Sequence, residues 1–491
     1  MRTNDSHVTQ DIMNAYNTPG ISIAVLPPSN GSQYTNTDLL TSTFGVGDCT
    51  DGGSTVDEET AFQAASISKP FTSLAVLQLV VQGTLNLDTD IEEYLALDKN
   101  HEVVRDDLHL SAVINPATAP RTPTTLRLLL GHESGLSTVS GFTGYYGQWA
   151  TIPPTPSTIN GINPSNNIPI RAFTLPGLGT SYSGGGTTVV QHILTLVTGK
   201  PFPVLMRELV LKPLGMTRST YKQPIGNGQL NRVNYAKAHH NAYTGYTAGT
   251  ECMIYPEIAA AGLWTMPTDI LKGLHVVFDC LSATDDSFLP PALVAELFTE
   301  HSGFGGFGIG WQVDTVNTDE GGGKRRILLG HGGSNQGFEC NLALVGDAPL
   351  VGRAPPVFGA TPPVGVAWMS NSDFGPQIGN RILTALGWLF SERLTLSDRE
   401  SGMPFFPVLT VTPAKHAKVA KQIAGWQAWK GAWQMKDGGD VAMHGPHVSL
   451  DIGEEEGLPT MKISVLTDVE RPLVLLPTAH HHEAGSGWSA I

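Results

Sequence analysis

The chain has 491 residues, a formal net charge of −15, and a composition with 41% hydrophobic and 15% charged residues. A chain of this length exceeds one ordinary folding core, so two or three domains are expected, and the composition is that of a globular protein. The negative charge argues against nucleic acid and against an anionic membrane as partners, because each binds a basic surface.

The sequence carries no signal for secretion, membrane insertion or metal binding. The N-terminal segment lacks the apolar core of a secretory signal, and no run of about 18 apolar residues could span a membrane. The four cysteines are far apart and form no Cys-x-x-Cys pair. We therefore expect a cytoplasmic protein without a metal or other cofactor.

Two groups of strands enclose a helical middle in the first 400 residues. Short β-branched runs predict a hairpin at 20–26 and 39–48, and strands return from about residue 305. Short helices separated by loops are predicted from about 90 to 270. This order favours an α+β domain over residues 1–400, in which helices flank an antiparallel sheet and form a helical subdomain.

The segment QAASISKPFTSLAVLQLVVQGTL, residues 63–85, predicts a buried helix. Leu74, Leu77 and Val81 recur at helical spacing, and the segment is apolar on most sides. Gly83 is a typical residue at which such a helix ends.

A long segment rich in Gly, Pro, Asn, Thr and Ser follows at residues 139–173, and we expect it to be a loop. It carries Tyr145, Tyr146 and Trp149, which favour either a lid over an apolar ligand or a surface loop packed by its own aromatic residues. Both interpretations are open. Beyond residue 405, short alternating segments predict a separate small β domain over 405–491.

Two Ser-x-x-Lys pairs occur, Ser66 with Lys69 and Ser219 with Lys222. Pro70 is tolerated only in the first turn of a helix, so Ser66 is expected at or just before the helix start, with Lys69 one turn on and on the same face. The unsatisfied N–H groups of a helix start could hold a developing oxyanion. The second pair follows a turn and has no apolar helix after it, so we expect a surface loop.

Ser66 and Lys69 fit nucleophilic catalysis if the lysine can act as a base. A serine hydroxyl is a poor nucleophile until a base takes its proton, and a lysine amine does so only where burial or a nearby cation lowers its pKa. On this motif alone, a capping serine beside a solvated lysine is the favoured interpretation.

Further motifs follow in a fixed order along the chain. They are TPGISIAVL, FQAASISKPFTSLAVLQLV, LRLLLGHESGLS, YSGGG, LKPLGMTRSTY, AAGLWTMPTDI, FGIGWQ and GHGGSNQGF. Together they resemble the serine β-lactamase and penicillin-binding-protein superfamily, in its class C-type esterase and D-aminopeptidase branch, from about residue 19 to 390. The resemblance implies the β-lactamase-like fold and a serine hydrolase that works through an acyl-enzyme.

The resemblance assigns a role to each motif residue. Ser66 would be the nucleophile, Lys69 the base or the group that orients it, and Tyr182 a second base that relays the proton to the leaving group. A phenol needs neighbouring cations to lower its pKa to near neutrality, and Lys69 and His331 are the candidates to supply them. The backbone N–H groups of Ser66 and Ser334 would form the oxyanion hole.

The same resemblance places the substrate near His331, Gly332 and Gly333, where the flanking glycines let a ligand approach the backbone. Without the motif order, Tyr182 would be interpreted as a core tyrosine and His331 as an ordinary strand histidine.

Two departures from the family pattern bear on the substrate. Gly184 stands where the family often has an asparagine, and His331-Gly332-Gly333 replaces Lys-Thr-Gly. The second change removes a fixed positive charge that would bind a carboxylate. Both changes argue against β-lactam hydrolysis and favour a small-molecule acyl substrate: an ester, lactone, thioester or small amide.

Other functions remain open at this point. An acyltransferase or cyclase would use the same acyl-enzyme with an alcohol or amine in place of water, and a non-catalytic binding protein would keep only the fold. The C-terminal segment resembles the lipocalin-like domain of some relatives and could contribute to a homo-oligomer.

Overall fold

The computed structural model assigns the chain to two units by its internal contacts, and each is described by itself. The first comprises Met1–Leu394 and Met403–Phe405, and the second comprises Thr395–Gly402 and Phe406–Ile491. The structure describes residues 13, 18–26, 39–49, 53–100, 103, 108, 122–136, 142–146, 151–223, 234–239, 241–242, 245–246, 252–280, 288–299, 306–317, 324–349, 364–374, 431–434, 447–455, 458–466 and 472–475.

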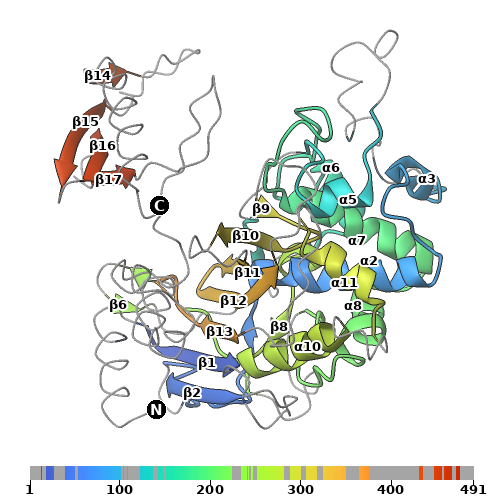
Figure 1. Cartoon of the computed structure of the whole chain (residues 1–491), viewed down its shortest axis with the longest axis horizontal. Helices are drawn as coiled ribbons and strands as arrows, with labels where there is room; N and C mark the ends of the chain where they lie inside the picture. The colour runs from blue at the N-terminus through green and yellow to red at the C-terminus, as the bar shows by residue number, and fades with distance from the viewer. Residues whose placement is uncertain are drawn as a thin grey trace. The chain divides into compact units, whose positions relative to one another are not determined.

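A seven-stranded antiparallel sheet forms the centre of the first unit, in the order β2-β1-β13-β12-β11-β10-β9 (Figure 1). Its strands are β1 Gly20–Leu26, β2 Leu40–Gly45, β9 Gly306–Phe307, β10 Gln312–Asn317, β11 Lys324–Asn335, β12 Phe338–Pro349 and β13 Val364–Ser370. The N-terminal hairpin thus joins strands from the end of the unit, with Ile21 opposite Ser370. All seven residues of β1 are buried, as expected of an inner strand rich in Ile, Val and Leu.

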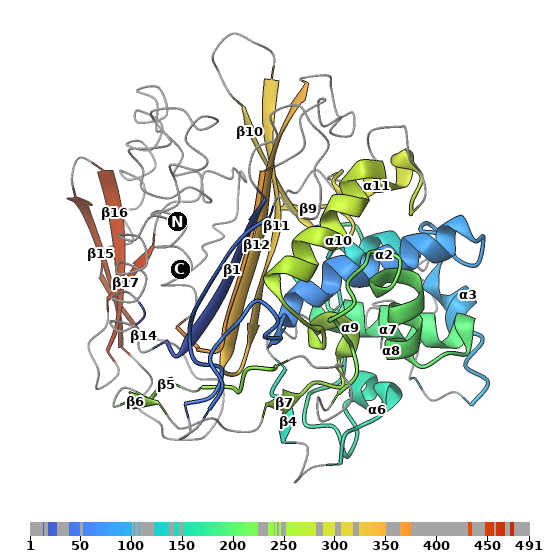
Figure 2. The same cartoon turned by 90° about the horizontal axis from the view of Figure 1, so that it is seen from below.

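Helices cover one face of this sheet, as Figure 2 shows for α10 Pro267–Asp279 and α11 Pro291–Leu297. Helix α10 contacts β1 and β13. Helix α2, Ser68–Val81, lies among the other helices, and every residue from Ser68 to Leu77 is buried. The predicted buried helix is therefore confirmed, and so is the α+β fold with helices on an antiparallel sheet.

Short helices and short strands make up the rest of the unit. The helices are α3 Ile91–Leu95, α5 Leu126–Leu130, α6 Thr155–Asn160, α7 Gly184–Thr198, α8 Phe202–Met206, the π-helix η3 Arg207–Leu211, and α9 Ile258–Ala261. The strand pairs are β3 Phe62–Gln63 with β8 Trp264–Thr265, β4 Tyr145–Tyr146 with β7 Met253–Ile254, and β5 Asn241–Ala242 with β6 Gly245–Tyr246.

The prediction of an uninterrupted loop at 139–173 is wrong, because α6 and β4 lie within it. Helix α6 follows Pro154, carries a proline in its first turn, and ends at Gly161 in the left-handed conformation (φ +60°). These are ordinary helix signals, concealed in a segment whose composition is that of a loop.

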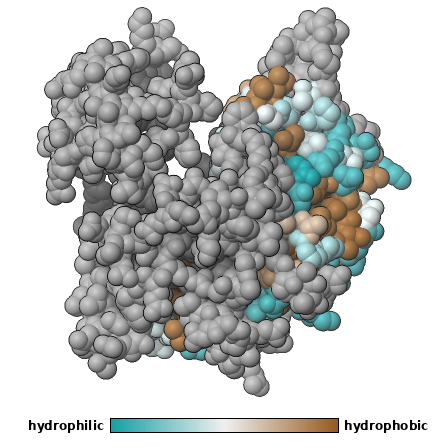
Figure 3. Space-filling model, viewed as in Figure 1, coloured by the Kyte–Doolittle hydropathy of each residue, from teal (hydrophilic) through white to brown (hydrophobic). Residues whose placement is uncertain are grey.

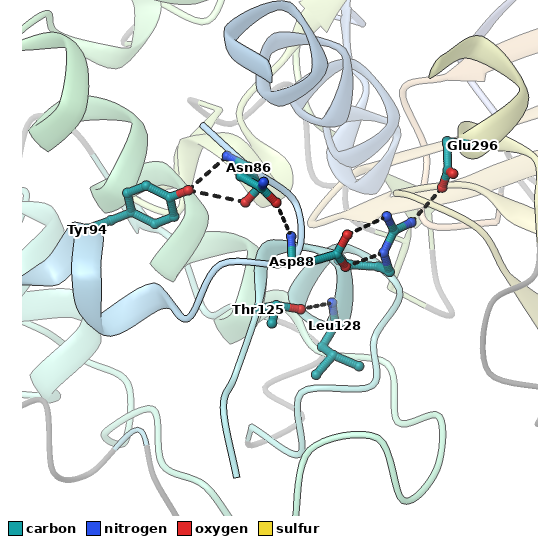
Figure 4. A network of polar contacts seen from close by, with 7 residues as sticks. Asn86, Asp88, Tyr94, Thr125, Leu128 and Glu296 are labelled. Carbon is teal, nitrogen blue, oxygen red and sulfur yellow. Dashed lines mark hydrogen bonds and ion pairs between the residues drawn. The ribbon is translucent and has the colours of Figure 1, made fainter. Parts of the chain in front are cut away.

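An arginine of α5 ties this helix to two other parts of the unit (Figure 4). Arg127 donates to both carboxylate oxygens of Asp88, at 2.7 and 2.9 Å, and to Glu296 of α11 at 2.5 Å. Thr125 caps the same helix by accepting the N–H of Leu128 at 3.3 Å. The network fixes α5, whose C-terminal end leads directly into residues 131–136 of the candidate site.

The second unit contains an antiparallel sheet in the order β14-β15-β16-β17, red in Figure 1. Its strands are β14 Gly431–Gln434, β15 His447–Glu455, β16 Leu458–Leu466 and β17 Pro472–Leu475. The likeness of this unit to a lipocalin stays a prediction, as do the domain limits at 400 and 405.

The described part of the surface is mixed, with hydrophobic patches among hydrophilic side chains (Figure 3). Among the described helices, none is by itself long and apolar enough to cross a membrane. A pair bent by 83°, Gly184–Thr198 with Phe202–Leu211, passes that test by length and composition. Its first eleven residues are buried inside the unit.

Candidate active site

Ser66 lies in a short 3₁₀ helix, η1 Ala65–Ile67, directly before α2, where the Pro70 argument predicts it. Ala65 has φ +43°, which is unusual for a residue other than glycine. The turn is held by Ser68, whose hydroxyl donates to the carbonyl of Ala65 at 2.5 Å and accepts the N–H of Leu263 at 2.9 Å. Backbone strain of this kind persists where the surrounding structure enforces it, often at functional sites.

Lys69 is buried and directed at Ser66. Its Nζ lies 2.9 Å from Ser66 Oγ and 3.0 Å from the carbonyl oxygen of Ala260 in α9. Burial lowers the pKa of Lys69 to about 7, because the ammonium loses its hydration. A large fraction of the side chain is therefore a neutral amine near neutral pH, which is the form that can accept a proton from Ser66.

The second Ser-x-x-Lys pair is arranged differently. Ser219 is buried, so the prediction of a surface loop is wrong for this residue; its hydroxyl bonds to Thr265 at 2.7 Å and to Asp269 at 2.9 Å. Lys222 is exposed. Ser219 thus has a structural partner and Lys222 an ordinary solvated position, which separates this pair from Ser66 and Lys69.

Tyr182 immediately precedes Ser183, which caps α7 by accepting the N–H of Gly186 at 2.9 Å. The hydroxyl of Tyr182 hydrogen-bonds to Ser66, and Lys69 Nζ lies 4.9 Å from the ring centroid of Tyr182. Burial nevertheless raises the pKa of Tyr182 to about 12, against the smaller opposing effect of the Ser66 hydrogen bond. The expectation of a phenol with a pKa near neutrality is wrong, and Tyr182 is a proton-bearing phenol in the free protein.

His331 lies near Tyr182, with ring centroids 5.8 Å apart. Burial, and then the charge of Lys69, lower the pKa of His331 to about 3. Its Nδ1 donates to the carbonyl oxygen of Gly332 at 2.6 Å, which leaves Nε2 as a lone-pair acceptor; Nε2 has no partner among the described residues. The expectation that His331 supplies positive charge is therefore wrong, because the ring is neutral at ordinary pH.

Sequence reasoning assigned no role to His132 and Phe307, although both lie against Tyr182. The ring centroid of His132 is 4.5 Å from that of Tyr182, and Phe307 is 4.6 Å from His132 and 5.9 Å from Tyr182. His132 belongs to the motif LRLLLGHESGLS, so a signal was present in the sequence. The motif could not show that this segment packs against Tyr182 in the folded chain.

The end of β11 lies against the nucleophile turn, and among the described strands it is paired on one side only. Strand β10 pairs with β11 only as far as Gly330, so the segment from His331 to Asn335 keeps β12 on one side. Asn335 and Phe338 close a two-residue turn as a hydrogen-bonded pair, and the antiparallel alternation then directs the N–H of Ser334 away from β12. This orientation supports the prediction that Ser334 contributes to an oxyanion hole.

Gly333 lets the strand approach this turn. A Cβ at Gly333 would lie 2.4 Å from the Ala64 carbonyl oxygen and 2.5 Å from Cys340 Sγ, whereas a Cβ at Gly332 would find its nearest atom, in Asn341, at 3.8 Å. We expect Gly333→Ala to lower the free energy of unfolding by about 1–3 kcal/mol, and Gly332→Ala to leave it within about 0.5 kcal/mol. Urea titration of both variants measures this; equal effects would contradict the close approach.

Hydrogen bonds from two side-chain amides connect the elements around Ser66. Asn335 at the end of β11 donates to Gln63 at 2.7 Å and to the carbonyl oxygen of Ala261 at 3.1 Å, and Gln63 donates to the carbonyl oxygen of Met253 at 2.8 Å. All of these amide atoms are buried, so each bond satisfies a group that would otherwise be costly. Strands β3, β7 and β11 and helix α9 are thereby held in one arrangement.

The predicted aromatic lid receives little support from these positions. Tyr145 is buried in β4, and its hydroxyl accepts the N–H of Asn166 at 2.6 Å. Tyr146 is 38% exposed, and Trp149 lies outside the described residues. A substrate contact by any of the three stays a prediction.

The model of the family described as Beta-lactamase matches residues 6–386, which include every residue of this site. The chain belongs to the β-lactamase family. Ser66, Lys69, Tyr182 and the His331-Gly332-Gly333 segment occur in the order that the resemblance predicted, and the structure brings them together.

Among curated proteins of this family, the chain is 25% identical to Esterase EstB of Burkholderia gladioli over 301 residues, which is 53% of this chain and 67% of that protein. It is 33% identical to Acyltransferase calJ of Penicillium decumbens over 85 residues, which is 17% of this chain and 20% of that protein. The matches thus span about two thirds of the first relative and a fifth of the second.

Among solved structures, the octameric penicillin-binding protein homologue from Pyrococcus abyssi superposes with a TM-score of 0.57 at 18% sequence identity. The comparison covers 98% of this chain and 92% of the archaeal one. At this identity the likeness shows the fold.

Proposed function

We propose that the protein is a serine hydrolase that cleaves an uncharged ester, lactone, thioester or small amide through an acyl-enzyme on Ser66. The observation that carries this proposal is the buried Lys69 amine, whose Nζ lies 2.9 Å from Ser66 Oγ and whose pKa is lowered to about 7. A nucleophile and a base of suitable pKa are thus within hydrogen-bonding distance.

The roles of the three polar side chains follow from their protonation states. Neutral Lys69 takes the proton of Ser66 as Oγ attacks the acyl carbonyl, and the resulting oxyanion is stabilised by the N–H groups of Ser66 and Ser334. Tyr182 still carries its proton, so it gives that proton to the leaving group and regains one from Lys69. Water then reverses these steps to release the acid.

An uncharged acyl group is favoured because the described residues around Ser66 and Tyr182 supply no fixed positive charge in the active form. His331 is neutral, and the lone pair on its buried Nε2 can accept a hydrogen bond but cannot attract a carboxylate. Lys69 Nζ lies 4.9 Å from the ring centroid of Tyr182, and this amine loses its charge in the active form. These properties support rejection of β-lactams, whose carboxylate requires a positive partner; turnover of penicillin or a cephalosporin at an ordinary enzymatic rate would overturn this part of the proposal.

Acyl transfer to an alcohol or amine is the second candidate, because the acyl-enzyme would be the same and one similar protein is described as an acyltransferase. Product analysis with an added alcohol or amine separates the two reactions, since a transferase forms a new ester or amide. A homo-oligomer stays a prediction; the octameric assembly is that of the archaeal homologue.

The decisive experiment is the intact-protein mass after incubation with a fluorophosphonate and with p-nitrophenyl butyrate. We expect one adduct on the wild type and none on Ser66→Ala, a change that removes a single oxygen and leaves the fold intact. Ser219→Ala is the matched control and keeps the adduct, because Ser219 is occupied by Thr265 and Asp269. An adduct on Ser66→Ala, or none on the folded wild type, would refute the mechanism.

A further inference from the structure

We infer that His132 is a positioning residue that holds the phenol of Tyr182 against Ser66. The inference rests on the proposed function, because it concerns the same acyl-transfer step. It assigns a task to a side chain that the proposed chemistry does not itself use.

His132 holds the chain on both sides of Tyr182. Its carbonyl oxygen accepts the N–H of Ser181 at 2.7 Å, and its ring Nδ1 accepts the N–H of Ser183 at 3.1 Å. Its ring also packs on Tyr182 itself, at 4.5 Å between centroids and an interplanar angle of 43°. One residue therefore restrains the tyrosine through the backbone before it, the backbone after it and the ring.

The hydrogen bond to Nδ1 fixes the state of the imidazole. Since Nδ1 accepts an N–H, a neutral ring must carry its proton on Nε2. Protonation of Nδ1 would place two N–H groups, those of Nδ1 and Ser183, opposite each other, and the hydrogen bond that restrains Ser183 would be lost. Burial, and then the charge of Lys69, hold the pKa of His132 well below its usual value, so the ring stays neutral and the restraint persists at ordinary pH.

The backbone of His132 indicates that this arrangement is enforced. His132 has φ +60°, and with Ala65 it is one of two described residues other than glycine that have a positive φ. A non-glycine residue in the left-handed region costs roughly 1–2 kcal/mol. Ala65 lies beside the nucleophile, and His132 lies beside the tyrosine. The left-handed backbone at His132 directs its ring toward Tyr182 while its carbonyl oxygen accepts the N–H of Ser181.

The rest of the environment supports a fixed tyrosine rather than a mobile one. Phe307 meets the His132 ring edge-on at 83° and lies 5.9 Å from Tyr182. Ser183 is at once the partner of His132 and the cap of α7, so the restraint is anchored to a fifteen-residue helix. A displacement of about 1 Å at a reacting group can cost roughly 100-fold in rate, which makes this positioning consequential.

Two substitutions separate the ring from the hydrogen bond. His132→Asn tolerates the left-handed backbone and keeps an acceptor for the Ser183 N–H, but removes the ring. His132→Phe keeps the ring and removes the acceptor. We expect each to lower kcat for ethyl butyrate by roughly 10- to 100-fold with KM within about twofold, since the phenol is displaced and the acyl pocket is not.

A double-mutant cycle with Tyr182→Phe is the decisive readout. If His132 acts through the phenol, both His132 variants lose nearly all of their effect once the hydroxyl of Tyr182 is absent. His192→Asn is the control: this buried histidine lies on α7 beside Asp98, at 3.9 Å, and its loss affects stability equally in both backgrounds. Equal fold-losses for His132 variants with and without the Tyr182 hydroxyl would overturn the inference.

A second readout does not depend on catalysis. With ¹⁵N-labelled imidazole, the histidine signal that disappears in a His132 variant should report the Nε2–H tautomer and should not titrate between pH 5.5 and 8. A signal of the Nδ1–H tautomer, or one that titrates near its ordinary pKa, would refute the restraint. Absence of any Ser66 adduct on the wild type, by contrast, would refute the proposed function. The ¹⁵N imidazole signal would then decide whether His132 restrains Tyr182.

Discussion

Lys69→Met should reduce the rate of Ser66 acylation by roughly 10³- to 10⁴-fold, and Lys69→Arg should be as inactive. Methionine fills the buried space but has no basic nitrogen. Arginine keeps the positive charge and the donors but cannot lose its proton in a protein. If Lys69 is the base, both fail; if it only orients Ser66 or supplies charge, the arginine variant should retain much of the activity.

The pH dependence tests the same role in the wild type. The pKa of Lys69 is lowered to about 7, so the neutral amine increases as the pH rises through 7. The rate of fluorophosphonate labelling should therefore rise with pH, reach half of its maximum near pH 7, and lose this dependence in Lys69→Met. A rate that falls through the same range would make the ammonium the active form. Lys222→Met, at an exposed lysine, serves as the control.

The depressed pKa also predicts a change in stability. The unfolded chain holds a proton on this lysine up to its ordinary pKa, near 10.5, whereas the folded chain releases it above about 7. Between these limits the unfolded state binds more protons, so this group makes the free energy of unfolding rise with pH and fall again as pH drops toward 7. Urea titrations of the wild type and Lys69→Met should differ in this slope.

Tyr182→Phe should impair acylation in proportion to how much the leaving group needs a proton. We expect a loss of roughly 10²- to 10⁴-fold for ethyl butyrate, because ethoxide must be protonated as it departs. The loss for p-nitrophenyl butyrate should be about tenfold or less, since that phenolate leaves without a proton. The ratio of kcat/KM for the two esters measures the effect directly, because kcat/KM reports acylation, whereas hydrolysis of the shared butyryl-enzyme is the same for both.

Tyr221 provides the matched control for this experiment. It is also a buried tyrosine beside the nucleophile helix, and its hydroxyl donates to the carbonyl oxygen of Ser68 at 3.0 Å. Tyr221→Phe removes a structural hydrogen bond, so any loss should be similar for both esters. If Tyr182→Phe also affects both esters equally, Tyr182 does not protonate the leaving group and the assigned role is wrong.

The position of the nucleophile was predictable because it depends on local geometry. Pro70 permits only the first turn of a helix, so Ser66 and Lys69 had to lie at its start and on one face. Strand β1 was equally predictable, since a short, mostly apolar segment with Ile21, Ile23 and Val25 as β-branched residues between turns is typical of a buried strand.

The charge states were not predictable from the sequence, because they depend on burial created by distant segments. His331 appeared suitable as a cation until its surroundings, with Lys69 nearby, were known to hold it neutral. Tyr182 likewise keeps its proton because it is desolvated. The contacts of His132 depend on a left-handed backbone conformation, which no pattern of residue types in LRLLLGHESGLS encodes.

The pairing of β1 with β13 has a consequence for synthesis of the protein. Strand β1 is buried on both faces, and one of its neighbours, beginning at Val364, emerges from the ribosome roughly 340 residues after Leu26. At about 5–20 residues per second, the N-terminal hairpin waits on the order of 20–70 s for its partner. During that interval the unpaired edge of β1 is available to neighbouring chains, so translation speed and holding chaperones should influence the yield of folded protein.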